Sequence, residues 1–274
     1  MFEPIIIHND EKVLTVDLHQ KLLLYEIKAS DKIPPPEVAL KIDNAIIGTL
    51  GNILSIIGKA KSRKSFFIGM AVSASVAKNN VISVLTNELP QAQRNVLYFD
   101  TEQGKYHVQK ALKRICTITG TIEPTNLNTY GLRALNPIER AELIEYAIYN
   151  TPNLGIVFID GIKDLITSIN DEEQATMIVS KLMKWSEEKN ILIVTVLHQN
   201  KGDNNARGHI GTELNNKAET VLSVSKSSDN EMVSIVQAEM CRNLEPESFA
   251  FEIDQNGIPY ISDYNIDNKP TKKL

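Results

Sequence analysis

A loop rich in lysine and serine, spanning residues 58–65, is the stretch of the chain best suited to chemistry. Its sequence Gly-Lys-Ala-Lys-Ser-Arg-Lys-Ser fits the phosphate-binding pattern G-x-x-x-x-G-K-[ST], except that Arg63 replaces the second glycine. In such a loop the backbone N–H groups face phosphate oxygens, Lys64 reaches the β- and γ-phosphates, and Ser65 completes a Mg²⁺ shell. The pattern predicts that ATP and Mg²⁺ are bound by Gly58, Lys59, Ala60, Lys61, Ser62, Arg63, Lys64 and Ser65.

Two alternatives to this interpretation stay open. The lysines would also suit an ordinary solvated loop between a strand and a helix. In addition, Arg63 stands where the loop needs the backbone freedom of glycine. Either Arg63 tolerates that conformation and adds a cation, or the loop binds nucleotide poorly. The apolar run before the loop and the small, apolar residues after it favour phosphate binding.

An aspartate at the end of a predicted buried strand is the second candidate. Asp160 follows the apolar residues 156–159, and a carboxylate in this position orients Mg²⁺ through water in phosphate-loop enzymes. The competing interpretation is an aspartate that caps a turn with Gly161. Its place about 100 residues after the phosphate loop favours the Mg²⁺ role.

Hydrolysis also needs a base near the attacking water, and Glu102 is the candidate. The position directly after Asp160, where many such enzymes carry a glutamate, is occupied by Gly161. Glu102 lies three residues past the apolar strand 95–99 instead. It is equally well explained as a carboxylate at the start of a helix, near Lys105.

An alternation of strands and helices must position these side chains. Strands are expected at 52–57, 95–99, 156–159 and 191–197, and helices at 65–78, 105–115, 140–149 and 171–189. Such alternation predicts an α/β fold with a mostly parallel sheet flanked by helices. Three consecutive strands at 220–224, 233–239 and 249–253 predict an antiparallel C-terminal extension of that sheet.

The three prolines at 34–36 divide the chain. We expect an N-terminal arm over residues 1–32, which packs on the main domain or on a neighbouring subunit. An ATPase domain then covers 33–265, and a basic tail covers 266–274. The arm is too short to bury a core alone.

Composition limits the possible partners and compartments. The chain has 29 lysines and arginines against 34 aspartates and glutamates, a net charge of −5, so any contact with nucleic acid must be local. Two cysteines suggest a reducing compartment, and no apolar run reaches the ~20 residues of a membrane helix. We expect a cytoplasmic protein without a membrane partner. The five histidines are scattered without metal-ligand spacing.

Together the loop 58–65, Asp160 and the segment Phe99-Asp100-Thr101-Glu102 resemble the RecA-like ATPases. The chain looks closer to the hexameric RepA- and DnaB-type helicases, and closest to RepA-like AAA-family ATPases of plasmids and mobilisable elements. The similarity covers residues 33–261. It implies a RecA-like phosphate-loop core, with Glu102 as the catalytic glutamate.

The resemblance assigns further roles. His198, with Gln199 as runner-up, corresponds to the polar residue that senses the γ-phosphate. The segment 204–212 resembles a loop lining the DNA channel, which makes Arg207 and His209 candidates, with Lys201, for binding DNA. Lys217 and Arg242 match positions of the arginine that one subunit inserts into its neighbour's site, although lysine lacks the bidentate fork of arginine.

Two main functions follow as hypotheses. The first is a Mg²⁺-dependent ATPase that forms an oligomeric ring, expected to be hexameric. It would act as a motor or helicase on single-stranded DNA in plasmid or mobile-element replication or mobilisation, with primase or mobilisation proteins as possible partners. The alternative is a nucleotide-gated module that binds DNA or protein and hydrolyses little. A filament-forming recombinase is a weaker third hypothesis.

Overall fold

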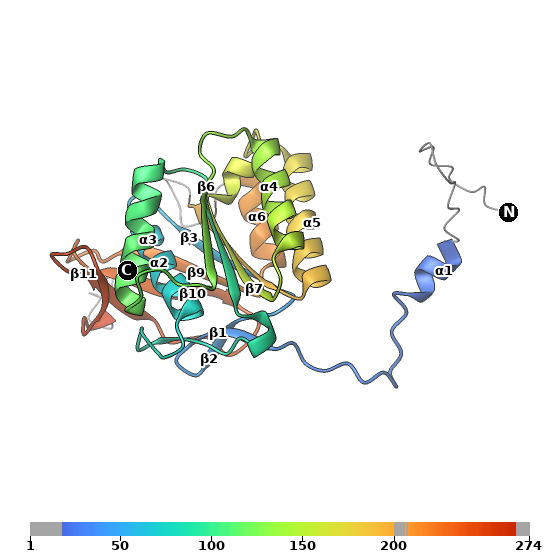
Figure 1. Ribbon diagram of the computed structural model, residues 1–274, viewed down its shortest axis with the longest axis horizontal. Coiled ribbons are helices and arrows are strands. Elements are labelled where there is room, and N and C mark those ends of the chain that lie inside the picture. Colours follow the sequence, from blue (N-terminus) through green and yellow to red (C-terminus); the bar gives the residue numbers. More distant parts are fainter. Residues whose placement is uncertain (1–17, 200–205, 207, 267–274) are drawn as a thin grey trace, which may run out of the picture. The chain divides into compact units, whose positions relative to one another are not determined.

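The computed structural model describes residues 18–199, 206 and 208–266, and the chain divides into two compact units, Met1–Pro35 and Pro36–Leu274 (Figure 1). Within the first unit, α1 (Leu18–Leu23) is a short helix without a buried side chain. The packing of the predicted arm stays a prediction. Lys201, Arg207 and the tail after residue 266 lie outside the described residues.

The second unit is built on one large sheet, which confirms the predicted α/β class. Its described strands run in the order β12-β11-β10-β9-β3-β8-β7-β5-β6. The six strands from β9 to β6 are parallel, so the first of the three predicted C-terminal strands, at 220–224, belongs to the parallel part of the sheet. As predicted, β10 and β11 extend the sheet antiparallel, and β12 adds an antiparallel strand that the sequence did not predict. In chain order the strands are β3 (Ile53–Gly58), β5 (Asn95–Asp100), β6 (Leu127–Gly131), β7 (Leu154–Asp160), β8 (Leu192–His198), β9 (Thr220–Lys226), β10 (Ser234–Cys241), β11 (Phe249–Ile253) and β12 (Pro259–Ser262).

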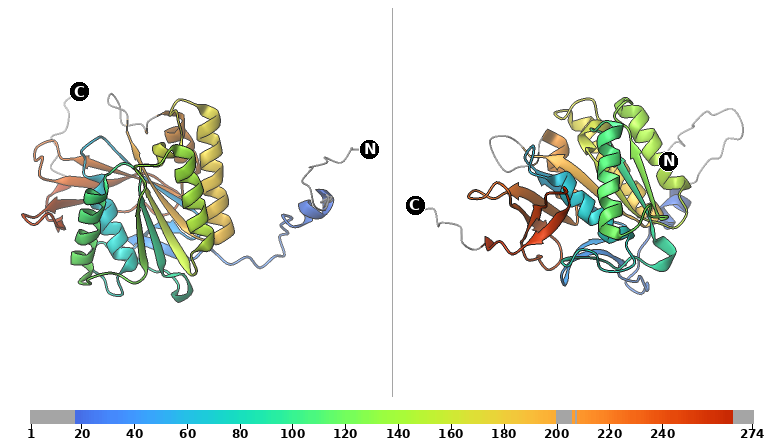
Figure 2. Two further views of the ribbon diagram at one scale, coloured as in Figure 1. Left: turned by 45° about the horizontal axis from the view of Figure 1, so that its top comes forward. Right: turned by 60° about the vertical axis from the view of Figure 1, so that its left-hand side comes forward.

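Helices cover both faces of this sheet (Figures 1 and 2). On one face lie α2 (Lys64–Val76) and α3 (Lys105–Thr119), and on the other lie α4 (Pro137–Asn150), α5 (Glu172–Lys189) and α6 (Gly208–Lys217). Side chains that are adjacent in a strand point to opposite faces. Accordingly, Ile156 and Phe158 of β7 belong to the core under α2, whereas Val157 and Ile159 belong to the core under α5. This double burial explains why the central strands read as unbroken apolar runs.

Local signals fix where two of these helices begin. In α4, Asn136 accepts a hydrogen bond from the Glu139 backbone while the Glu139 side chain accepts one from the Asn136 backbone, a capping box. In α5, the Asp171 side chain accepts from the Gln174 backbone N–H. No helix within the described ranges has the length and apolar composition needed to cross a membrane.

A second, small sheet was not expected from the sequence. It pairs β1 (Val38–Ile42) with β2 (Ala45–Thr49) and with β4 (Leu85–Asn87), all antiparallel. The buried Glu219 carboxylate joins β2 to the large sheet, because it accepts hydrogen bonds from the Thr49 backbone at 2.8 Å and from Asn243 at 2.9 Å.

Candidate active site

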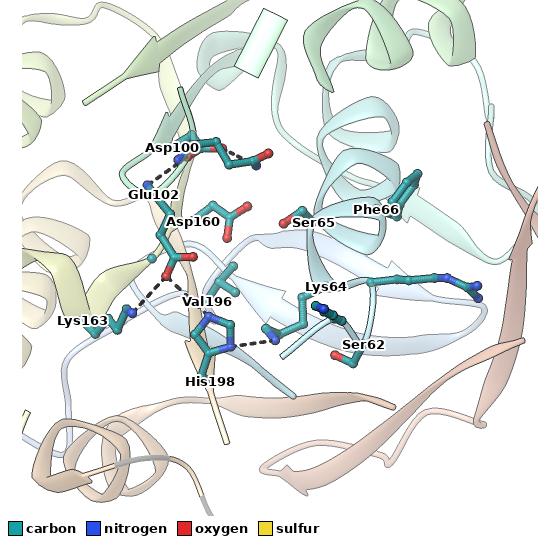
Figure 3. A pocket seen from close by; sticks show the side chains of 14 residues that line it. Ser62, Lys64, Ser65, Phe66, Asp100, Glu102, Asp160, Lys163, Val196 and His198 are labelled. Carbon is teal, nitrogen blue, oxygen red and sulfur yellow. Dashed lines mark hydrogen bonds and ion pairs between the residues drawn. The ribbon is translucent and has the colours of Figure 1, made fainter. Parts of the chain in front are cut away.

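A pocket of about 450 Å³ lies at the carboxyl ends of four adjacent parallel strands, β3, β8, β7 and β5 (Figure 3). Strand register brings these ends level, because Gly58 pairs with His198 and Asp100 pairs with Asp160. Ligands of open α/β sheets bind at this edge. The pocket is lined by Lys61, Ser62, Arg63, Lys64, Ser65, Phe66, Asp100, Glu102, Gln103, Asp160, Gly161, Lys163, Val196 and His198.

The loop between β3 and α2 begins at a glycine that has no room for a side chain. A Cβ at Gly58 would come within 2.4 Å of the Val224 carbonyl oxygen and 2.7 Å of Ser62 Oγ. At the other end of the loop, Arg63 precedes α2 in the left-handed conformation, with φ 72° and ψ 26°. Arg63 therefore adopts the backbone conformation for which glycine is the usual residue.

The Arg63 side chain is held by the antiparallel extension of the sheet. Its Nη1 donates a hydrogen bond to the Met232 carbonyl and another, at 3.3 Å, to Ser234 Oγ at the start of β10. These bonds help to hold the arginine in its left-handed conformation and tie the loop to the C-terminal strands.

Lys64 occupies the centre of the loop. Its Nζ donates to the carbonyl oxygens of Gly58 at 2.7 Å and Lys59 at 2.8 Å, and lies 3.2 Å from His198 Nδ1. Burial lowers the pKa of Lys64 to about 8, against the opposing effect of Asp160 and Glu102. The side chain is thus still mostly cationic at neutral pH and is placed where a phosphate on the loop would meet it.

Asp160 lies beside Ser65, at the start of α2. The Ser65 side chain hydrogen-bonds to the Asp160 carboxylate, while Tyr98 Oη donates to it at 3.5 Å. Burial raises the pKa of Asp160 to about 7, and the negative charge of Asp100 adds to the shift. A hydroxyl and a carboxylate oxygen side by side are the hard donors that Mg²⁺ prefers.

Asp100 fixes the loop that carries Glu102. Its Oδ1 accepts from the backbone N–H groups of Glu102 at 3.0 Å and Gln103 at 2.7 Å, and its Oδ2 accepts from Gln103 Nε2 at 2.7 Å. Both oxygens are therefore engaged by the loop itself. Asp100 positions the glutamate rather than facing the pocket with free oxygens.

Glu102 is flanked by two nitrogen groups from other strand ends. Its Oε1 lies 3.5 Å from His198 Nε2 and 3.4 Å from Lys163 Nζ. The hydrogen bond with His198 lowers the pKa of Glu102 to about 2, with a further contribution from the charge of Lys163, although partial burial opposes the shift. The carboxylate is ionised throughout the neutral range.

Contacts of His198 join the phosphate loop to the glutamate (Figure 3). Its Nδ1 faces Lys64, and its Nε2 faces Glu102. A neutral ring with its proton on Nε2 satisfies both contacts, since Nδ1 then accepts from the ammonium and Nε2 donates to the carboxylate. His198 therefore contacts both the lysine of the phosphate loop and the glutamate.

Three further predicted residues that the structure describes, His209, Lys217 and Arg242, are not among those that line this pocket. His209 is exposed in the first turn of α6. Lys217 and Arg242 are exposed neighbours, and Arg242 Nη2 donates to the Lys217 carbonyl at 3.3 Å. Both lie near Thr220, where β9 begins beside the amino-terminal part of β3, so roughly 15–20 Å of strand separates them from the phosphate loop of their own chain.

Asp100, Thr101 and Lys163 were missed as site residues. The position of Asp100 at a strand end, like that of Asp160, was a signal in the sequence. Thr101 carried none, yet its Oγ1 donates to the carbonyl oxygens of Asp160 at 3.1 Å and Gly161 at 3.0 Å. Lys163 lies in the 3₁₀ turn Ile162–Leu165, for which the sequence gives no signal, so its approach to Glu102 could not be predicted.

A comparison with protein families finds a match to a model described as an AAA domain, over residues 21–204 of the 274. The matched residues include the phosphate loop, Glu102, Asp160 and His198, whereas Lys217 and Arg242 lie beyond them. No curated protein matches the chain.

Proposed function

The chain belongs to the AAA domain family of nucleotide-binding ATPases, and from this premise we propose that it is a Mg²⁺-dependent ATP hydrolase working as a ring of subunits. The ring is expected to be hexameric and to act as a motor or helicase on single-stranded DNA. The observation that carries the proposal is the continuous contact from Lys64 through His198 to Glu102, at the mouth of a phosphate-type loop.

The loop and the start of α2 provide the phosphate site. The first N–H groups of a helix have no partner within the helix and favour an anion there. Ser62 Oγ is buried in the same loop and has no hydrogen-bond partner among the described residues. Lys64 adds a positive charge at the centre of the loop. Its ammonium can exchange its hydrogen bonds to the Gly58 and Lys59 carbonyls for bonds to phosphate oxygens.

The residues beside the loop suit Mg²⁺. Ser65 would be its protein ligand, and Asp160 would orient its water ligands. Within the described ranges, no group of three acidic, histidine or cysteine side chains forms a metal cage. This agrees with an ion held largely by water and phosphate. When bound, Mg²⁺ neutralises charge that develops on the phosphates.

Glu102 is the base in this proposal. It is ionised at neutral pH and lies beside His198, the residue proposed to sense the γ-phosphate. When Lys64 turns to the phosphates, His198 loses a partner at Nδ1, and its hold on Glu102 changes. The site can thus register an occupied loop before a water molecule is activated.

The position of the arginine and lysine candidates supports a shared site. Arg242 and Lys217 lie too far from their own phosphate loop to reach it. They are exposed, as a group that acts on a neighbouring subunit must be. DNA binding by His209, Arg207 and Lys201 belongs to the same proposal, and of these only His209 lies among the described residues.

Steady-state ATP hydrolysis tests the proposal, measured over a range of protein concentrations with and without single-stranded DNA. We expect turnover per subunit to rise with concentration and with DNA. Lys64→Ala should abolish nucleotide binding, whereas Glu102→Gln should bind ATP normally without turnover.

Other outcomes separate the alternatives. Tight ATP binding with negligible turnover under every condition would replace the motor with a nucleotide-gated binding module. Turnover that is independent of protein concentration would contradict a site shared between subunits. Unchanged ATP affinity in Lys64→Ala would remove the phosphate loop from the mechanism.

A further inference from the structure

Lys163 is a cation of the pocket that no sequence motif indicated. It lies in the turn directly after Asp160, and its Nζ is 3.4 Å from Glu102 Oε1 (Figure 3). The same ammonium is 4.0 Å from Asp164 Oδ1, a longer contact. Both Lys163 and Glu102 are about one third exposed, at 31% and 37% of their side-chain surfaces. Because the two groups are close and only partly exposed, the charge of Lys163 acts directly on the Glu102 carboxylate.

The backbone fixes both ends of this pair. Next to Glu102, the Thr101 backbone N–H donates to the Asp160 carbonyl at 3.1 Å. The Thr101 hydroxyl lies within hydrogen-bond distance of the Asp160 and Gly161 carbonyls and, at 2.9 Å, of Asp164 Oδ2. Gly161 allows this close approach, because a Cβ there would lie 2.3 Å from Thr101 Oγ1 and 3.0 Å from Glu102 Cγ. The loop of Glu102 and the turn of Lys163 are thus held against each other independently of the ion pair.

We propose that Lys163 is a positioning residue that holds the Glu102 carboxylate in the orientation required for ATP hydrolysis. The inference rests on the proposed function and adds a residue to its mechanism. Lys163 and His198 approach the same oxygen, Oε1, from two different strand ends. Among the described residues, no hydrogen bond or ion pair involves Oε2. With Oε1 held from two sides, Oε2 is directed and available to accept a proton from water.

Neither partner alone fixes the carboxylate. A single contact leaves a glutamate free to rotate about its terminal torsions, whereas two contacts on one oxygen restrict that rotation. Other charged groups around Glu102 do not replace Lys163, because Asp100, Asp160 and Asp164 carry the same sign as the glutamate. Lys64 is engaged by the phosphate loop and by His198.

Lys163→Met tests the inference, since it removes the ammonium and keeps an unbranched side chain that is one atom shorter. We expect kcat to fall about tenfold, the scale of a lost orientation, while KM and Kd for ATP stay within about twofold. Lys163→Arg should restore most of the turnover, because the guanidinium can also pair with Oε1. Lys181→Met is the matched control, since it removes the similarly exposed ion pair of Lys181 with Glu145 at 3.1 Å.

A measurement without nucleotide separates positioning from a general loss of activity. In the nucleotide-free protein, the carboxyl ¹³C resonance of Glu102, assigned by its loss in Glu102→Gln, should shift and broaden in Lys163→Met. It should return in Lys163→Arg and stay unchanged in Lys181→Met. An unchanged resonance in Lys163→Met would overturn the inference.

The kinetic outcomes distinguish this inference from the proposed function. If the wild type hydrolyses ATP and Lys163→Met is equally fast, only the positioning role fails. A raised KM with unchanged kcat would also overturn it and make Lys163 a nucleotide-binding residue. If the wild type shows no turnover, the proposed function fails, and the inference fails with it.

Discussion

Asp160 is a carboxylate whose surroundings oppose its charge. Its pKa is raised from 3.8 to about 7, chiefly by burial and then by Asp100 at the adjacent strand end. Bonds from Ser65 and the charge of Lys64 offset only part of this effect. A bound cation would stabilise the charged form of Asp160. Without one, the ionised carboxylate destabilises the folded protein.

The first prediction concerns the stability of the nucleotide-free protein. Because the folded pKa exceeds the unfolded one, folded Asp160 binds a proton more tightly, and stability decreases as pH rises from about 4 to about 7. Asp160→Asn removes that loss. We expect the variant to be more stable than the wild type at pH 8, by at most on the order of 4 kcal/mol, with a smaller difference at pH 5. Thermal unfolding at the two pH values measures this.

A control variant tests whether the effect comes from the burial of Asp160 or from the loss of any carboxylate. Asp263→Asn removes an exposed carboxylate and should change the melting temperature little at either pH. A lower melting temperature for Asp160→Asn at pH 8 would show that the bonds of the carboxylate outweigh its desolvation.

At the scale of elements, the loop before α2 contains two left-handed residues, Lys61 with φ 63° and Arg63, and the second of these directly precedes the helix. Arg63 has φ 72°, and its guanidinium bonds to the Met232 carbonyl and Ser234. Both Arg63→Gly and Arg63→Ala lose these bonds, but only glycine adopts the conformation without steric cost. We expect the glycine variant to be more stable than the alanine variant by about 1 kcal/mol, measured by urea unfolding.

The two variants also bear on function. If the loop requires the left-handed conformation and not the side chain, Arg63→Gly should retain ATP affinity, and Arg63→Ala should bind more weakly. Equal stability and equal affinity would mean that the loop relaxes around position 63. The arginine would then have no conformational role.

Elements whose signals are local could be predicted from the sequence. The four strands that end at the pocket are apolar runs bounded by glycine, aspartate or histidine, and the carboxyl ends of parallel strands converge at one edge. The residues themselves indicated the phosphate loop, Asp160 and Glu102, and the family resemblance added His198. The structure brings these four around one pocket, while their roles stay predictions.

Elements that depend on distant partners could not be predicted. The strands of the small sheet have three to five residues each, and β1 pairs with β4 more than forty residues later in the chain. Strands this short have little intrinsic β-propensity, and they form because they pair with segments distant in the sequence. Lys163 was missed for a similar reason, since its contact with Glu102 requires the turn after Asp160 to meet the loop after β5.

At the scale of the whole molecule, charge does not mark a nucleic-acid surface. The net charge is −5, so under the proposed function a DNA contact would come from a few local cations repeated around a ring. The same ring would bring Arg242 and Lys217 to the phosphate loop of the next subunit. If the proposed ring forms, we expect activity to depend on the assembly rather than on the isolated chain.

Mixing two inactive variants tests this directly. Lys64→Ala has a defective phosphate loop but an intact Arg242, and Arg242→Ala has the reverse. Each alone should hydrolyse little ATP. In an equimolar mixture, a working site forms wherever an Arg242→Ala subunit receives Arg242 from a Lys64→Ala neighbour. Random assembly then gives roughly one quarter of wild-type turnover per subunit.

The same experiment decides between the two candidate residues. Suppose that mixing with Lys64→Ala restores turnover to Lys217→Ala but not to Arg242→Ala. The shared role would then belong to Lys217, which supplies charge without the bidentate fork. Substantial turnover by Arg242→Ala and Lys217→Ala alone would show that neither residue acts across subunits. Mixtures that remain as inactive as their components would mean that each site is completed within its own chain, and that Arg242 and Lys217 act by holding the start of β9.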